Sequence, residues 1–452
     1  MRLVLDRVLS LLTGLALRGF FRGVEVEGRD RIPADRPLLI VANHYNGLVD
    51  AALIAHTLGR IPRFVAKAEL WERRLARPFL WLAGLVPVHR RGDRGDRGDP
   101  SQNVRTFATC HELLVRGKVV AVFPEGAVSA TPSLLPVRTG AARIALGARD
   151  DGARGLVIVP LGLAYEDRLA LRSRALVRVG RPIDVDADLA SSDTPKPDAD
   201  GVDHAAVRTL TADIATRLGE VVPAYSDYRE AAVLGRAAEL ALRPHGRIPP
   251  PRVPLLHRET VAQELARTPR DARTRLLDAL ARYELDLALL GLRDAYLVAE
   301  YRAGRLLRLA LRTAFKLALT APLAVPGLLI NVLPYWAVRW TGRLVRDPLM
   351  RATGRLLAGA LFFPVAWIVV AVLSPVEGWL AHFAVLATAP LLGLVTVWSA
   401  EQAVSAARSW RGWITLMERA GDLGQLRDDR ARVVTLVTSD APSARAFAAP
   451  DA

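Results

Sequence analysis

Short apolar runs alternate with amphipathic stretches through the first 180 residues. Continuous runs such as LLIVAN and KVVAVF suit strands that are buried on both faces of a sheet. Strands are expected at residues 24–28, 38–43, 63–66, 85–89, 118–123, 155–165 and 175–180. Helical spacing marks the stretches between them, at 49–58, 70–83, 101–116 and 138–149. This alternation predicts an α/β sandwich.

Helical patterns dominate the rest of the chain. Residues 204–315 include one long helical candidate at 271–301, and three apolar segments follow at 317–336, 356–373 and 379–398. The last two approach the ~20 residues that cross a bilayer, which predicts a membrane-embedded helical region. Three prolines interrupt the first segment, for which we expect a re-entrant or interfacial course. A buried soluble helical core is the alternative.

Charge around the last two apolar segments indicates their orientation. The turn between them, SPVEG, has no Lys or Arg, whereas arginines precede and follow the pair. The positive-inside rule therefore predicts a hairpin with both ends in the cytoplasm. The first 23 residues show helical apolar spacing with basic flanks, as in a helix on a membrane surface. Packing of this helix on its own domain is the alternative.

These patterns divide the chain into five regions. The acidic, Pro-rich stretch 184–203 and the repeat RGDRGDRGD at 91–99 are expected as exposed loops. We predict a membrane-associated helix at 1–23, an α/β domain at 24–225, a helical linker at 226–315, membrane segments at 316–400 and a cytoplasmic tail at 401–452.

Composition limits the classes of molecule that the protein is expected to bind. A net charge of +15 suits nucleic acid, anionic lipid or phosphorylated substrates. Zinc-finger spacing, RNA-binding aromatic motifs and a long basic tail are all missing from the sequence, so we expect no nucleic-acid partner. The single cysteine, Cys110, excludes an intrachain disulfide and a cysteine-based metal site.

Two polar clusters directly follow buried strands, where α/β folds place their sites. In VANHYNGLVD, His44 can act as a general base and Asp50 can hold its ring in the useful tautomer. A purely structural His–Asp hydrogen bond is the alternative.

The second cluster begins with FPEG, after the strand expected at 118–123. Glu125 and Gly126 lie in a tight turn whose backbone amides could face a phosphate. Arg138 precedes a helix-like run, and a helix N-terminus with an arginine suits an anion. Lys67, at the end of an expected strand, is a candidate for binding a phosphate or another part of a substrate, or else a solvated lysine.

Taken together, four blocks within residues 24–183 resemble the phospholipid/glycerol acyltransferase superfamily. The first block matches Asn43, His44 and Asp50. The second is VPVHR with Arg90, the third is FPEG, and the fourth is VIVPLGLAYED with Pro160. The resemblance implies a glycerolipid acyltransferase-type α/β sandwich.

The spacing between the first-block residues departs from the commonest family pattern. Five residues instead of four separate His44 from Asp50, as in the branch that contains fungal-type glycerol-3-phosphate/dihydroxyacetone-phosphate acyltransferases and bacterial relatives. Gly47 could absorb the extra residue.

The resemblance also implies a reaction. His44 would deprotonate a hydroxyl of glycerol-3-phosphate or 1-acylglycerol-3-phosphate, which attacks the thioester of acyl-CoA or acyl-carrier protein. Asp50 would orient His44, while the acceptor is positioned by Arg90, Glu125, Gly126 and Arg138. Lys67 would be a candidate for binding the acyl donor or a phosphate. No metal or resident cofactor is expected, and the implied location is the cytoplasmic membrane, in contact with membrane lipid, with the site on its cytoplasmic side.

Two other functions stay open. A lipid-binding protein could keep this fold without catalysis, and the acyl group could go to a different lipid acceptor. A serine hydrolase is disfavoured because the sequence has no G-x-S-x-G elbow.

Overall fold

The computed structural model describes residues 2–68, 72, 84–88, 100–189, 203–419 and 423–448. The helix predicted at 70–83, the repeat at 91–99 and most of the loop predicted at 184–203 lie outside this part of the chain. The chain divides into two units. One comprises Met1–Ala224 with Asp347–Thr353, and the other comprises Tyr225–Arg346 with Gly354–Ala452.

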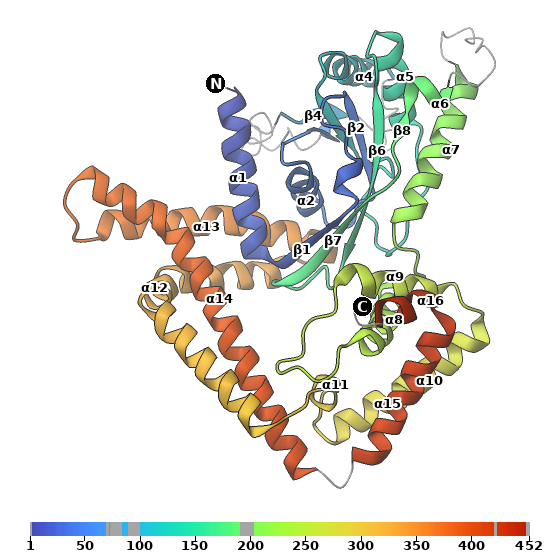
Figure 1. Cartoon of the computed structure of the whole chain (residues 1–452). Coiled ribbons are helices and arrows are strands. Elements are labelled where there is room, and N and C mark those ends of the chain that lie inside the picture. The colour runs from blue at the N-terminus through green and yellow to red at the C-terminus, as the bar shows by residue number, and fades with distance from the viewer. Residues whose placement is uncertain are drawn as a thin grey trace. The chain divides into compact units, whose positions relative to one another are not determined.

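The sheet of the first unit confirms the seven predicted strands. They are β1 (Phe21–Glu27), β2 (Leu38–Ala42), β3 (Arg63–Lys67), β4 (Val86–Val88), β5 (Val119–Val122), β6 (Val157–Tyr165) and β7 (Ser173–Val179). Their order is β1-β7-β6-β2-β5-β3-β4, with β2 parallel to both β5 and β6. Figure 1 shows β2 and β6 side by side. A two-residue strand, β8 (Ile183–Asp184), pairs with β6 and is too short to leave a pattern in the sequence.

Both faces of this sheet are buried, as the continuously apolar strands require. Leu39 and Val41 of β2 pack in one core cluster with α4 (Pro100–Val115), α5 (Gly140–Asp150) and α7 (His204–Val221). Leu38 and Ile40 point to the opposite face and are equally buried. The α/β sandwich is therefore confirmed.

Two further helices of the first unit pack against each other, α1 (Arg2–Phe20) and α2 (Leu48–Leu58). Near the end of α1, Leu17 is buried, whereas Leu11 and Leu12 are exposed. The C-terminal part of α1 thus packs within its own unit. Membrane association of its exposed apolar side stays a prediction.

The second unit has a helical core of its own. Its helices are α8 (Tyr228–Leu242), α9 (Leu255–Ala266), α10 (Arg270–Leu289), α11 (Asp294–Leu297), α15 (Leu423–Asp440) and α16 (Pro442–Ala448). The single helix predicted at 271–301 was wrong, because the chain turns at Gly291, whose φ of 66° favours glycine.

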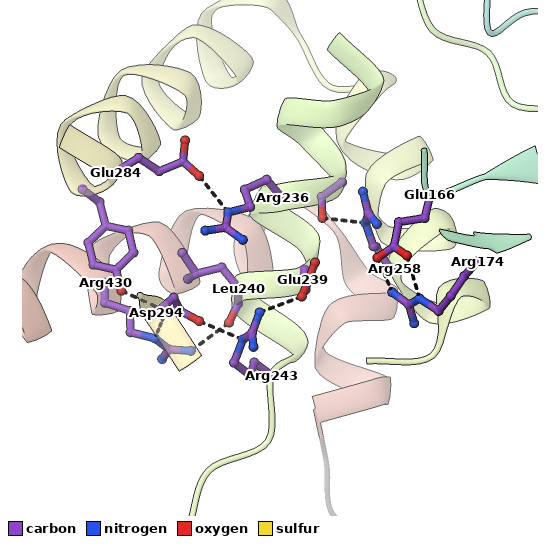
Figure 2. A network of polar contacts seen from close by, with 12 residues as sticks. Glu166, Arg174, Arg236, Glu239, Leu240, Arg243, Arg258, Glu284, Asp294 and Arg430 are labelled. Atoms are coloured by element: carbon purple, nitrogen blue, oxygen red, sulfur yellow. Dashed lines mark hydrogen bonds and ion pairs between the residues drawn. The ribbon is translucent and has the colours of Figure 1, made fainter. Parts of the chain in front are cut away.

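A buried charge network joins four of these helices (Figure 2). Asp294 of α11 is paired with Arg430 of α15 at 2.7 Å and with Arg243, just after α8, at 2.9 Å. Tyr283 of α10 donates to the same carboxylate at 2.9 Å. Because a buried charge is costly unless paired, these contacts fix how the helices pack.

Three long apolar helices lie wholly or mostly in the second unit, α12 (Ala303–Leu344), α13 (Arg351–Leu373) and α14 (Trp379–Glu418). The first three residues of α13 belong to the first unit. Each is long and apolar enough to cross a membrane. Large exposed side chains such as Leu333 and Trp379 mark surfaces that suit lipid. The helices predicted at 356–373 and 379–398 are thus confirmed, and α14 extends well beyond its predicted end.

The prolines do not interrupt the helix at 317–336, contrary to expectation, while the re-entrant or interfacial course of this segment stays a prediction. Helix α12 runs without a break through Pro322, Pro326 and Pro334. Each proline removes a single backbone donor, a loss that apolar helices tolerate when a neighbouring helix supports them. That support comes from α14, which lies alongside α12 (Figure 1). Contact is close at Gly327, where an added Cβ would lie 2.4 Å from the Leu392 carbonyl oxygen.

Candidate active site

His44 and Asp50 meet just beyond the carboxyl end of β2. The Nδ1 atom of His44 lies 2.8 Å from Oδ2 of Asp50. Asp50 is completely buried in the first turn of α2, whereas 16% of the His44 side chain is exposed. A carboxylate at Nδ1 favours the tautomer that carries its proton there. Nε2 is then the nitrogen that can accept a proton from a substrate.

The loop between these two residues accommodates the five-residue spacing as predicted. Gly47 has a φ of 53°, a left-handed conformation that other residues rarely adopt. This turn directs the backbone amides of Tyr45 and Asn46 to Asp50 Oδ2, each at 2.7 Å. The extra residue therefore does not separate the pair.

Two contacts from β6 hold this loop, and one of them involves a residue that the sequence analysis missed. The hydroxyl of Tyr165, the last residue of β6, donates to Asp50 Oδ1. The Asn43 side chain exchanges two hydrogen bonds with the backbone of Leu163, at 3.1 and 2.7 Å. β2 and β6 are parallel, so residues at their carboxyl ends meet at one edge. The position of Tyr165 at the end of a predicted strand was the available signal.

Glu125 supports the backbone of this loop from the end of β5. It is 2% exposed; Oε1 accepts the His44 amide at 2.9 Å and Oε2 accepts the Leu135 amide at 3.0 Å. Burial raises the pKa of Glu125 to about 7. Its acceptor-binding role stays a prediction, since both carboxylate oxygens are engaged by the protein's own amides.

The FPEG turn also contacts the His44 ring and Arg138. Phe123 stacks on the imidazole, with ring centroids 3.9 Å apart. The Arg138 amide donates to the Pro124 carbonyl at 3.0 Å, and its guanidinium lies across Gly126, where an added Cβ would be 3.1 Å from Nε. Arg138 is exposed and forms no ion pair with any residue that the structure describes. Its positive charge lies beside the turn, just before α5.

The structure describes the other residues singled out from the sequence to different extents. Lys67 ends β3, where its backbone pairs with Val88 of β4, and nothing is described of its side chain. Arg90 lies outside the described residues. Cys110 is fully buried in the core, in keeping with a packing role. Within the described ranges, no group of three or more His, Cys, Asp or Glu side chains could hold a metal ion.

Comparison with known proteins agrees with the resemblance seen in the motifs. Residues 23–164 match the family model described as Acyltransferase. Glycerol-3-phosphate O-acyltransferase 2 of Saccharomyces cerevisiae is 33% identical over 140 residues, 29% of this chain and 19% of the relative. The 1-acyl-sn-glycerol-3-phosphate acyltransferase alpha of Homo sapiens is 31% identical over 180 residues, 38% of this chain and 58% of the relative. The predicted resemblance is therefore confirmed for this segment.

The matches cover only part of each protein. This chain spans less than two thirds of the length of either relative. Among solved structures, PlsC from Thermotoga maritima, a 1-acyl-sn-glycerophosphate acyltransferase, aligns with a TM-score of 0.32 and 21% identity, covering 47% of this chain and 79% of that chain.

Proposed function

Since residues 23–164 match the Acyltransferase model and hold the His44–Asp50 pair, we propose that this chain is an O-acyltransferase of phospholipid synthesis. It transfers a fatty acyl group from an acyl thioester to a hydroxyl of glycerol-3-phosphate or 1-acylglycerol-3-phosphate. The observation that carries the proposal is the imidazole oriented by a buried carboxylate, with its Nε2 left for a substrate.

In the reaction a proton moves from the acceptor hydroxyl to His44 and then from His44 to the leaving thiolate. His44 Nε2 takes the proton of the acceptor hydroxyl as its oxygen attacks the thioester carbonyl carbon. Collapse of the tetrahedral intermediate forms the ester, breaks the carbon–sulfur bond and returns the proton from the imidazolium to the thiolate. Asp50 stabilises the imidazolium and keeps the ring in place. Direct transfer requires no covalent intermediate on the protein.

Arg138 binds the phosphate of the acceptor in this proposal. This exposed guanidinium beside the FPEG turn suits a phosphate, because an arginine can donate two parallel hydrogen bonds to it. Arg90, two residues beyond β4, is the second arginine that we assign to the phosphate. An acceptor that carries a phosphate is favoured over a neutral lipid for this reason.

The apolar helices fit substrates with fatty acyl chains. Helices α12, α13 and α14 have the length and composition of membrane spans. Placing the protein in the cytoplasmic membrane would give the acyl donor and the lipid product a shared location. The arginines around the last two apolar segments favour a site on the cytoplasmic side.

One assay tests the proposal directly. The full chain in lipid nanodiscs would be offered labelled palmitoyl-CoA or palmitoyl-acyl-carrier protein. The acceptors, tested in parallel, would be glycerol-3-phosphate, dihydroxyacetone phosphate, 1-acylglycerol-3-phosphate and, as an acceptor without phosphate, monoacylglycerol. We expect a labelled ester of a phosphorylated acceptor, lost in His44→Ala. Lipid binding without transfer would indicate a non-catalytic protein, and transfer only to an acceptor without phosphate would indicate another substrate.

A further inference from the structure

The loop between His44 and Asp50 is held by a side chain that lies about 300 residues further along the sequence. Thr353 lies in the first turn of α13, within the segment Asp347–Thr353 that belongs to the α/β unit. Its Oγ1 donates to the Asn46 carbonyl at 3.2 Å and accepts the Leu48 amide at 3.1 Å. Thr353 is 7% exposed. The hydroxyl thus uses both its donor and an acceptor position on this loop.

These two contacts flank the residue that absorbs the extra length of the loop. Gly47 lies between Asn46 and Leu48, and a Cβ on it would be 2.5 Å from Thr353 Oγ1. The hydroxyl therefore fills the space that any side chain at position 47 would need. The Thr353 hydroxyl and the missing side chain of Gly47 are therefore complementary at this bend.

We propose that Thr353 is a positioning residue for the His44–Asp50 pair, an inference that rests on the proposed acyl transfer. The Asn46 amide is one of the two that donate to Asp50 Oδ2, and Asn46 is also the residue whose carbonyl Thr353 binds. Fixing Asn46 and Leu48 restrains the loop on both sides of Gly47. The carboxylate and the imidazole then keep their relative orientation.

A longer loop explains why such a restraint is needed. An additional residue gives the backbone between base and carboxylate more conformations, and an ordered site must restrict them. The start of α13 supplies the restriction. The first turn of an apolar helix, some 300 residues along the chain, thereby becomes part of the machinery that orients the base.

Two variants isolate the hydroxyl. Thr353→Ala and Thr353→Ser both lose the methyl group, and they differ only in whether the hydroxyl remains. We expect kcat of Thr353→Ala to fall roughly tenfold or more, with the KM for the acceptor unchanged, because a displaced catalytic group slows the reaction steeply. Thr353→Ser should retain most of the wild-type kcat. Thr341→Ala is the control and should behave as wild type, because its hydroxyl bonds the Ala337 carbonyl of its own helix and no other group among the residues that the structure describes.

A second measurement does not depend on activity. Hydrogen–deuterium exchange, followed by mass spectrometry of peptides that cover residues 44–50, should be faster in Thr353→Ala than in wild type and Thr353→Ser. Equal kcat and equal exchange in the Ala and Ser variants would overturn the positioning role. If wild type transfers no acyl group while the exchange difference is present, the loop restraint stands and the proposed function fails.

Discussion

The Tyr165 hydroxyl donates to Oδ1 of Asp50, the carboxylate oxygen that His44 does not use. Oδ2 accepts His44 Nδ1 and two backbone amides. The buried carboxylate is therefore bound on both oxygens by groups from β6 and from its own loop. An anion held in this way has little freedom to turn away from the imidazole.

Removing the Tyr165 hydroxyl should slow the reaction without unfolding the protein. In Tyr165→Phe the ring keeps its stacking on Phe21, 6.1 Å away, but Oδ1 loses this hydrogen bond. A hydrogen bond to a charged group contributes about 1.5–3 kcal/mol to the stability of the arrangement that it holds. Without it Asp50 orients His44 less firmly, so we expect a roughly tenfold or larger fall in kcat. Steady-state kinetics and a melting curve test this. A wild-type kcat would show that the backbone amides alone hold Asp50.

Replacing His44 or Asp50 should lower kcat much more than removing the Tyr165 hydroxyl does. We expect His44→Ala and Asp50→Asn to lower kcat by about 10²–10⁴, because proton transfer loses its acceptor or its orientation. The chain provides a control in His111 and Asp151, a pair of the same 2.8 Å length whose carboxylate is exposed, unlike that of Asp50. His111→Ala should keep wild-type activity. Comparable losses in the two histidine variants would refute the assignment of His44.

Arg138→Ala should act mainly on binding of the acceptor. Loss of a charged hydrogen bond to phosphate should raise the KM for the phosphorylated acceptor roughly tenfold to a hundredfold, while the KM for the acyl donor stays constant. Arg143→Ala, an exposed arginine on α5, removes the same charge one turn further along. Arg143→Ala should leave the KM for the acceptor and the KM for the acyl donor near their wild-type values. An unchanged acceptor KM in Arg138→Ala would remove its proposed role.

Glu125 should make stability depend on pH. Burial raises its pKa to about 7 from the ordinary 4.5, so between these values the folded protein binds a proton that the unfolded chain releases. This contribution to stability is fully present below about pH 4.5 and is lost as the pH rises through about 7, on the order of 3 kcal/mol in total. Glu125→Gln cannot ionise and should lack it. Melting temperatures of both proteins from pH 4.5 to 8 test this, and parallel curves would contradict it.

The local pattern of the sequence was enough to predict the layers of the α/β unit. Continuous apolar runs marked β2, β5 and β6, since a strand buried on both faces cannot alternate polar and apolar residues. The same reasoning placed His44 and Glu125 at strand ends. It failed at α12, where prolines were expected to end a helix that packing against α14 sustains.

Contacts between distant residues were decided by the tertiary structure alone. Tyr165 reaches Asp50 because β6 is the parallel neighbour of β2, and Thr353 reaches Asn46 from the start of α13. The sequence by itself determined which segments are strands, which are apolar helices and which residues can carry acid–base chemistry, because periodicity and residue type are local properties. Which hydroxyl touches which carboxylate or amide depends on strand order and helix docking, and these are set by packing across more than a hundred residues of chain.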